Sequence, residues 1–418
     1  MNKSKLDFNV KLLLAMFFMG SFFYSSAQSE SLQSANVLEF GPENILFVGD
    51  SKSGEIHAFH TETVENPTMQ YGYNLKNAGK MIASFLGTIA ENILVKDLAV
   101  HPSTKEAYIA ISRISGEKYV PVIVILNQSG AIRLFDAEKA KSTSIALNNF
   151  IPQDFKFWDK TPSRALSITD IDYHNGKLYI SGLSNADFAS TLRVIDYPFK
   201  GSNQNTISVE IFHTNHGQTQ TRAPIRTLEI VSLDDKEYLL AAFTCTPLVT
   251  IPLEDLKDGA HVTGKTIAEL GFGNTPIDLI GYMAQDMQEN KYPVVFMSNK
   301  NQAAQVIALN QITEGNNKEG LKTFTAFKKA GVEAFDVPIT STLQVADQDG
   351  YHLLAIRRDV DSGNLELVSI MKNLYFRLSD FESEYEFPDY TYPEGSDFIK
   401  GVQNMMKKDE GFSGKVVD

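Results

Sequence analysis

A strand–turn–strand pattern that recurs six times constrains this fold more than any other feature of the sequence. Each copy has a strand, a short polar turn, a β-rich strand that ends in small or polar residues, a loop and a third strand. Turns such as His174-Asn175-Gly176 are rich in Asn, Asp and Gly, which is typical of antiparallel hairpins. The first strands are expected at residues 37–40, 97–100, 170–173, 227–231, 277–282 and 342–345.

The second and third strands follow within each copy, and further β-like runs at 206–213 and 321–327 are expected to supply outer, fourth strands. The second strands are predicted at 45–49, 107–111, 177–181, 238–243, 293–297 and 352–356, and the third at 55–59, 120–126, 191–196, 248–253, 304–309 and 364–370. Six four-stranded copies predict an all-β fold, a six-bladed β-propeller, better than a sandwich, which has fewer strands and no such period. Seven blades remain open if residues 66–87 contain an irregular blade.

The N-terminus has the pattern of a cleaved secretory signal. Lys3, Lys5 and Lys11 are followed by an apolar run over 12–23, and Ser25-Ser26-Ala27 places small residues before a cut near Ala27. We therefore expect a signal peptide over 1–27, a β-propeller over 28–380 and a short acidic and aromatic C-terminal extension over 381–418, with a helix near 396–410. The mature chain is expected to be secreted or periplasmic, without stable membrane insertion.

Charge and cysteine usage narrow the classes of partner. The chain has a net charge of −13, which argues against nucleic acid as a partner because nucleic-acid binding needs a basic surface. Cys245 is the only cysteine, so the fold has no internal disulfide. The remaining candidate partners are a small molecule, a glycan or a protein.

The predicted topology brings the start of each first strand and the end of each second strand to one mouth of the ring. Ligand sites of closed β architectures lie at such mouths, so we expect a polar funnel there. The candidate ligand-binding residues, taken from second-strand ends and from connections to the same face, are Asp50, Arg113, Trp158, Asn185, Arg226, Asn299, Arg357 and Arg358.

Three carboxylates open first strands and form a candidate metal site: Asp97, Asp170 and Asp278. Carboxylates gathered around an axis are costly unless a cation or hydrogen bonds compensate them. Oxygen ligands of this kind suit Ca²⁺ or Mg²⁺, so one divalent cation is the candidate cofactor. The alternative is that each Asp accepts backbone N–H groups and ties neighbouring strands together.

Cys245, His213 and His216 form the candidate catalytic set. Cys245 directly follows a predicted buried strand, and its thiolate could act as a nucleophile or as a soft metal ligand, with His213 or His216 as the base or second ligand. The alternatives are a small buried thiol and a solvated histidine loop. The sequence leaves open whether the chain is an enzyme.

Two segments resemble known propeller repeats. Residues 46–51 with Gly54-Glu55-Ile56 resemble the repeat of NHL-type propellers, and residues 171–181 resemble both that repeat and the repeat of gluconolactonase-like six-bladed enzymes. The second resemblance implies a divalent cation on the axis, where Asp97, Asp170 and Asp278 stand, although the usual Asn-Gly or Asp-Gly opening is absent at all three. A binding propeller is therefore the first hypothesis, and a metal-dependent, lactonase-like hydrolase or a redox or thiol enzyme using Cys245 is the alternative.

Overall fold

The computed structural model describes residues 32–62, 72–157, 161–285, 289–387, 392 and 396–413, which belong to one compact unit, Ser31–Asp418. The predicted signal peptide and Trp158 lie outside the described residues. No helix within the described ranges is long and apolar enough to cross a membrane.

Most strands belong to antiparallel sheets of four, each with a first strand at its inner edge. One sheet contains β1 (Val37–Phe40), β2 (Ile45–Asp50), β3 (Glu55–His60) and β9 (Ser142–Ala146). A second contains β5 (Ile93–Val100), β6 (Ala107–Ser115), β7 (Lys118–Leu126) and β8 (Ile132–Leu134). A third contains β21 (Pro276–Gln285), β22 (Lys291–Asn299), β23 (Ala304–Ala308) and β25 (Phe335–Val337), and a fourth contains β26 (Thr342–Asp347), β27 (His352–Arg358), β28 (Leu365–Met371) and β4 (Asn74–Leu75).

The remaining large sheet joins two four-stranded arrays through a parallel pair, β15 with β20. One array is β12 (Asp170–His174), β13 (Lys177–Leu183), β14 (Ser190–Asp196) and β15 (Asn205–His213). The other is β17 (Ile225–Leu233), β18 (Lys236–Phe243), β19 (Pro247–Pro252) and β20 (His261–Glu269). The short strands β16 (Gln218–Gln220) and β24 (Ala330–Gly331) pair with β15 and β20, and β10 (Lys156–Phe157) pairs with β11 (Thr161–Pro162).

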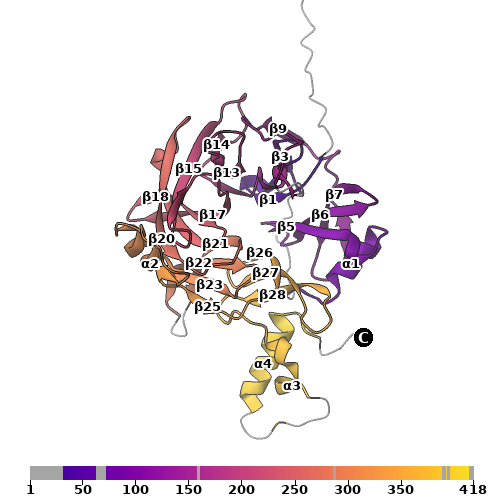
Figure 1. The fold of residues 1–418 in the computed structure, drawn as a ribbon. Coiled ribbons are helices and arrows are strands. Elements are labelled where there is room, and N and C mark those ends of the chain that lie inside the picture. Colours follow the sequence, from indigo (N-terminus) through magenta and orange to yellow (C-terminus); the bar gives the residue numbers. More distant parts are fainter. Residues whose placement is uncertain are drawn as a thin grey trace, which may run out of the picture. The chain divides into compact units, whose positions relative to one another are not determined.

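The inner strands contact one another in a closed cycle, in the order β1, β12, β17, β21, β26, β5 and back to β1. Figure 1 shows the sheets arranged around a common centre, with β1, β5, β17, β21 and β26 on the inside. The predicted all-β, propeller-like arrangement is therefore confirmed. Second strands such as β18 are buried along most of their length because a neighbouring sheet covers each face, which explains their almost continuous apolar sequence.

The chain path around this ring differs from the order of the repeats in the sequence. After β3 the chain supplies β4 as the outer strand of the β26–β28 sheet, builds β5 to β8, and returns as β9 beside β3. The β1–β3 sheet therefore lies between the β5 and β12 sheets, although β5 follows it in sequence. Residues 66–87, a candidate for an extra blade, contain β4 and the helix α1 (Ala78–Phe85) in their described part.

Two strand predictions are corrected by the structure. Residues 321–327 form no strand, and β25 occupies the outer position instead, because 321–327 is a turn-rich segment with outward-facing phenylalanines. The strand predicted to end at residue 309 ends at Ala308, where the helix α2 (Leu309–Asn316) begins. The helices α3 (Glu382–Tyr385) and α4 (Ser396–Lys408) follow the last sheet, with α4 at the expected helix. Single 3-10 turns occur at Pro42–Asn44, Ala90–Asn92, Ser163–Leu166, Leu253–Asp255 and Leu378–Phe381.

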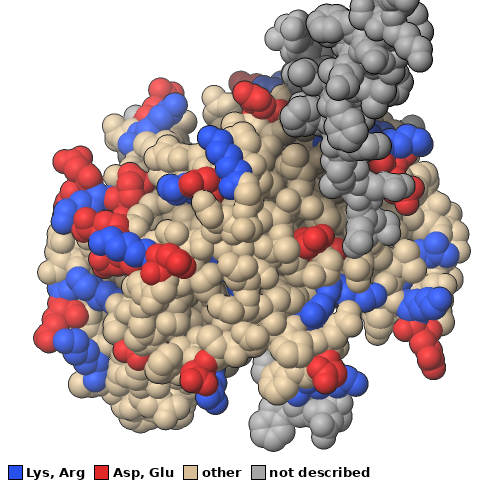
Figure 2. All heavy atoms as spheres, turned by 90° about the horizontal axis from the view of Figure 1, so that it is seen from above, with Lys and Arg blue, Asp and Glu red and all other residues tan. Residues whose placement is uncertain are grey.

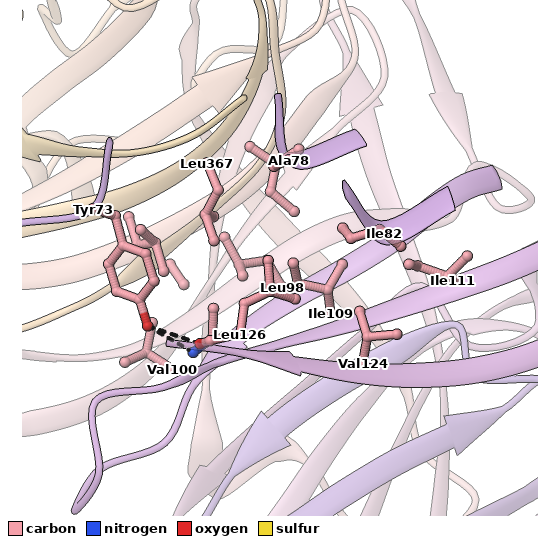
Figure 3. Close-up of a cluster of buried hydrophobic side chains, with 14 of the residues drawn as sticks. Tyr73, Ala78, Ile82, Leu98, Val100, Ile109, Ile111, Val124, Leu126 and Leu367 are labelled. Carbon is pink, nitrogen blue, oxygen red and sulfur yellow. Dashed lines mark hydrogen bonds between the residues drawn. The ribbon is translucent and has the colours of Figure 1, made fainter. Parts of the chain in front are cut away.

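Tyr73, directly before β4, joins two neighbouring sheets of the ring. Its side chain is fully buried among aliphatic residues of both sheets (Figure 3). The phenol oxygen lies 3.0 Å from the carbonyl oxygens of Lys105 and Leu126 and accepts a 3.1 Å hydrogen bond from the Ala107 N–H. Its backbone N–H donates to Ser369 Oγ on β28 at 2.8 Å. A single residue thus links the β5–β7 and β26–β28 sheets.

Candidate functional site

Cys245 lies in the tight turn that connects β18 to β19. The turn is closed by a 2.8 Å hydrogen bond from the Thr246 N–H to the Phe243 carbonyl, so Cys245 occupies its third position. The φ angle of Cys245 is 67° and that of Thr246 is 60°. Positive φ at this position normally selects Gly or Asn, and it is a marked outlier for a β-branched residue. The thiol is therefore presented by a strained turn.

The two histidines belong to the turn between β15 and β16. His213 is the last residue of β15 and is only 3% exposed, whereas His216 is exposed. The side-chain amide of Gln220, on β16, lies between the two rings, with Oε1 2.9 Å from His213 Nδ1 and Nε2 2.5 Å from His216 Nδ1. Burial lowers the pKa of His213, so this imidazole is neutral near pH 7.

The structure brings the thiol and both imidazoles together. The Cys245 sulfur and one nitrogen of each histidine all lie within 4.8 Å of one another, and the two imidazole centroids are 4.0 Å apart. The parallel pairing of β15 with β20 explains this proximity, because it fixes the end of β15 beside the array that contains Cys245. His213 Nε2 is buried and has no hydrogen-bond partner. We call this group the thiol–imidazole cluster.

Three half-exposed phenylalanines stand beside the cluster, and we call them the aromatic wall: Phe272, Phe324 and Phe327, which are 53%, 54% and 52% exposed. The Phe327 ring lies 4.9 Å from the Phe272 ring and 5.6 Å from the Phe324 ring. Phe272 is fixed to the cysteine turn through its neighbours. The Cys245 N–H donates to the Asn274 carbonyl at 2.7 Å, and Thr246 Oγ1 donates to the Gly271 carbonyl at 2.6 Å.

The other two phenylalanines lie over the histidine turn. Phe324 faces the backbone of Gly217, and Thr325 donates from its N–H to the Thr214 carbonyl at 3.3 Å and from Oγ1 to Asn215 Oδ1 at 3.0 Å. Ala326 and Phe327 have φ angles of 51° and 65°, a second strained pair at this face. The wall thus spans both turns. Because its three residues lie far from Cys245 in sequence, no local pattern pointed to them.

A buried carboxylate is hydrogen-bonded to the histidine turn of the cluster. Glu269, the last residue of β20, is fully buried and accepts a 2.5 Å hydrogen bond from Thr214 Oγ1, between the two histidines in sequence. Burial raises the pKa of Glu269 to about 7. Its bond to Thr214 holds the histidine turn against the end of β20.

A second polar feature is the central cavity, of about 1440 Å³, lined by all six inner strands. It extends to the turns that follow the first strands, including Lys105 and Asp349. Its walls carry seven carboxylates from inner strands: Glu39, Asp97, Asp170, Asp172, Glu229, Asp278 and Asp347. Burial raises the pKa of each of them, to about 7 for Asp170 and Asp278, and neighbouring carboxylates add to the shift for most.

The three aspartates of the candidate Ca²⁺ or Mg²⁺ site all line this cavity. Each of them hydrogen-bonds a backbone N–H of the neighbouring inner strand: Asp97 to Leu38 at 2.6 Å, Asp170 to Leu228 at 2.8 Å and Asp278 to Val345 at 2.9 Å. Among the residues that the structure describes, only the thiol–imidazole cluster brings three thiol, imidazole or carboxylate ligand atoms within 4.8 Å of one another.

The described residues of the predicted ligand-binding set do not gather in this cavity. None of Asp50, Arg113, Asn185, Arg226, Asn299, Arg357 and Arg358 lines it. Several have structural partners instead: Asp50 accepts from the Gln33 N–H, Asn299 Oδ1 accepts from Asn274, and Arg357 pairs with Glu366 and Asp380. Figure 2 shows a side of the molecule on which basic and acidic side chains are interspersed.

Comparisons with known proteins leave the family open. No protein-family model and no curated protein matches this chain. Among solved structures, the chain is similar to Drosophila Semaphorin 1b, extracellular domains 1–2, with 9% identity, a TM-score of 0.34, and coverage of 82% of this chain and 85% of that one. It is also similar to a chain of Drosophila Plexin A in complex with Semaphorin 1b, with 9% identity, a TM-score of 0.35, and coverage of 82% and 86%. Similarity at this level carries no implication for what this chain binds.

Proposed function

We propose that this chain is an exported six-bladed β-propeller that binds a ligand with an apolar part at the aromatic wall, beside the thiol–imidazole cluster. Six blades are supported by the cyclic contacts of six inner strands, each of which begins a four-stranded array. Export is supported by the basic start, the apolar run and the small residues before Gln28. N-terminal sequencing of the secreted protein tests that cleavage.

The observation that carries the proposal is the convergence of three half-exposed phenylalanines on one cluster of donor groups. Exposed aromatic residues that touch one another and are fixed by hydrogen-bonded turns mark interaction sites more often than isolated apolar residues do. Backbone strain at Cys245 and Phe327 is also typical of functional sites. The wall offers contact with an apolar surface, and the cluster offers polar specificity beside it.

The test is saturable binding of an apolar fluorescent probe, 1-anilinonaphthalene-8-sulfonate, to the folded mature protein. We expect one probe site, and Phe272→Ala or Phe324→Ala should weaken it about fivefold, since an aromatic contact contributes roughly 1 kcal/mol. Phe335→Ala is the matched control, because Phe335 is 71% exposed but lies on β25, outside the wall. Equal weakening in the control, or unsaturable binding, would refute the proposal.

The central cavity supports a second candidate function, binding of a positively charged ligand. Its seven inner-strand carboxylates repel one another, and a bound cation would relieve that repulsion. Calorimetry with spermidine and with Ca²⁺ tests this, with Glu39→Gln expected to weaken binding because Glu39 lies among Asp172, Asp170 and Glu229. Unchanged binding by that variant would count against a site in the cavity.

A further inference from the structure

We propose that Cys245, His213 and His216 bind one transition metal ion of the zinc and copper class. This goes beyond apolar binding at the same face, because it depends on the three donor groups and not on the aromatic wall. The three ligand atoms already lie within 4.8 Å of one another without an ion. A shift of a few tenths of an ångström to about one ångström in the side chains would bring them onto one ion.

The chemistry of the donors selects the class of metal. One thiolate and two imidazoles form a nitrogen–sulfur set, which suits Zn²⁺ and copper and does not suit Ca²⁺ or Mg²⁺, ions that prefer oxygen ligands. The site is therefore distinct in chemistry from the carboxylates of the central cavity.

The hydrogen bond between Gln220 and His213 orients the His213 ring for metal binding. Gln220 Oε1 accepts from His213 Nδ1, so Nδ1 carries a proton and Nε2 is the nitrogen left to bind a metal ion. That Nε2 atom belongs to a side chain only 3% exposed and has no hydrogen-bond partner. A buried acceptor without a partner is costly, and a metal ion would satisfy it. This observation is independent of the proximity of the three residues.

Metal binding by His216 requires a change in its hydrogen bond with Gln220. Gln220 Nε2 donates to His216 Nδ1, so Nδ1 already accepts a hydrogen bond and an N–H of the ring lies at Nε2. Metal binding through Nδ1 therefore requires that this hydrogen bond opens, and binding through Nε2 requires that the ring proton moves to Nδ1, which opens the same bond.

The backbone at Cys245 gives a third argument. A glycine would relieve the strain of a φ angle of 67° at the third position of this turn, yet the chain has a cysteine there, its only one. The thiol of a half-buried residue adds little packing that could compensate that strain. A role as a metal ligand accounts for cysteine at a position that favours glycine.

The coordination would be incomplete with protein ligands alone. Three protein ligands leave a fourth position of a tetrahedral ion for water or for a donor atom of a bound molecule, as in catalytic zinc sites. The aromatic wall stands beside that cluster, fixed to the same two turns. A ligand with a metal-binding head and an apolar body would match both features.

The test is titration of the full mature protein, kept reduced by a phosphine, with Zn²⁺, Cu²⁺ and Co²⁺ separately. We expect one equivalent bound, and a thiolate-to-cobalt charge-transfer band in the near ultraviolet. Cys245→Gly should abolish that band and weaken zinc binding more than about 100-fold, since loss of a mere outer-shell partner costs 10–100-fold. His213→Gln should weaken binding comparably, and Gln220→Ala by about tenfold.

The choice of test variant and one control keep the outcome decisive. Cys245→Gly is compatible with the φ angle of the turn, so a loss of metal binding would not reflect misfolding. His261→Gln removes a surface histidine on β20 and should bind metal as the wild type does. Absence of a metal equivalent in the wild type, or unchanged affinity in both Cys245→Gly and His213→Gln, would overturn the proposal. Probe binding at the aromatic wall is measured separately, so its failure would not be mistaken for failure of the metal site.

Discussion

The Asp170 carboxylate on β12 accepts a 2.8 Å hydrogen bond from the Leu228 N–H on β17, the inner strand of the next array. Asp97 does the same for Leu38, and Asp278 for Val345. Glu229 continues the pattern by accepting from the Gly281 N–H at 3.1 Å. Acidic residues on the inner strands therefore tie neighbouring sheets of the ring together. The donors are backbone N–H groups at the inner edge of each sheet, where the sheet itself offers no acceptor on that side.

Asp170→Asn should destabilise the fold by about 1–3 kcal/mol below pH 7, because an NH₂ group cannot accept from a backbone N–H, whereas either oxygen of the Asp170 carboxyl can, protonated or not. Asp170 accepts from both Ile171 and Leu228, so one bond must be lost. Urea unfolding measures the change. Asp196→Asn is the control, since Asp196 is exposed and forms only a surface ion pair with Lys177, and it should change stability by less than about 0.5 kcal/mol. Equal effects of the two substitutions would contradict a role for Asp170 in linking neighbouring sheets.

The same carboxylate should make stability depend on pH. Burial raises the pKa of Asp170 from 3.8 to about 7, so between these values the folded state holds a proton that the unfolded state releases. Its contribution to stability is therefore full below about pH 4 and falls as pH rises through 7. We expect the stability difference between wild type and Asp170→Asn to shrink from about pH 5 to about pH 8, measured by urea unfolding. The contributions of histidines are the same in both proteins and cancel in this comparison. A stability difference that grows with pH would refute the raised pKa of Asp170.

Tyr73→Phe should destabilise the protein by about 1–3 kcal/mol while leaving its packing intact. The substitution removes the acceptor of the buried Ala107 N–H between the β5–β7 and β26–β28 sheets. Thermal unfolding of Tyr73→Phe and of Tyr119→Phe gives the comparison, because Tyr119 is 60% exposed. A Tyr73→Phe protein as stable as the Tyr119→Phe protein would show that the phenol oxygen is dispensable.

Glu410 should anchor the C-terminal segment. It is fully buried, accepts from the N–H groups of Leu378 at 2.6 Å and Ser379 at 2.9 Å, and lies beside the fully buried Arg377. Glu410→Ala would remove the carboxylate nearest to the buried Arg377 and the acceptor of two backbone N–H groups, so a loss of about 3–5 kcal/mol is expected in urea unfolding. Glu384→Ala, on the short helix α3, serves as the control. A loss below about 1 kcal/mol for Glu410→Ala would contradict an anchoring role.

Cys245→Gly should change stability by less than about 1 kcal/mol, because relief of the left-handed backbone offsets the extra freedom of the unfolded chain. Ala241→Gly, in the buried middle of β18, should instead cost about 1 kcal/mol or more. Urea unfolding of both variants makes the comparison. A strongly destabilised Cys245→Gly protein would mean that the thiol is needed for packing.

The sequence determined the fold class because each hairpin is local. The β1–β2 and β12–β13 hairpins pair through short turns, and their alternation and turn residues are visible in the chain itself. The same register suggested that Cys245 could approach His213 or His216. The run at 321–327 was mistaken for a strand because its apolar composition matches a strand while its backbone turns instead.

Only the tertiary structure decided which distant segments meet. The outer strands β4 and β9 pair with β28 and β3, more than 80 residues away in sequence, and no local pattern specifies such a partner. The parallel pairing of β15 with β20 placed both histidines beside the thiol, and the aromatic wall assembled from residues 272, 324 and 327. Local propensity determines strands and turns, whereas the geometry of a site depends on long-range packing that closes the ring.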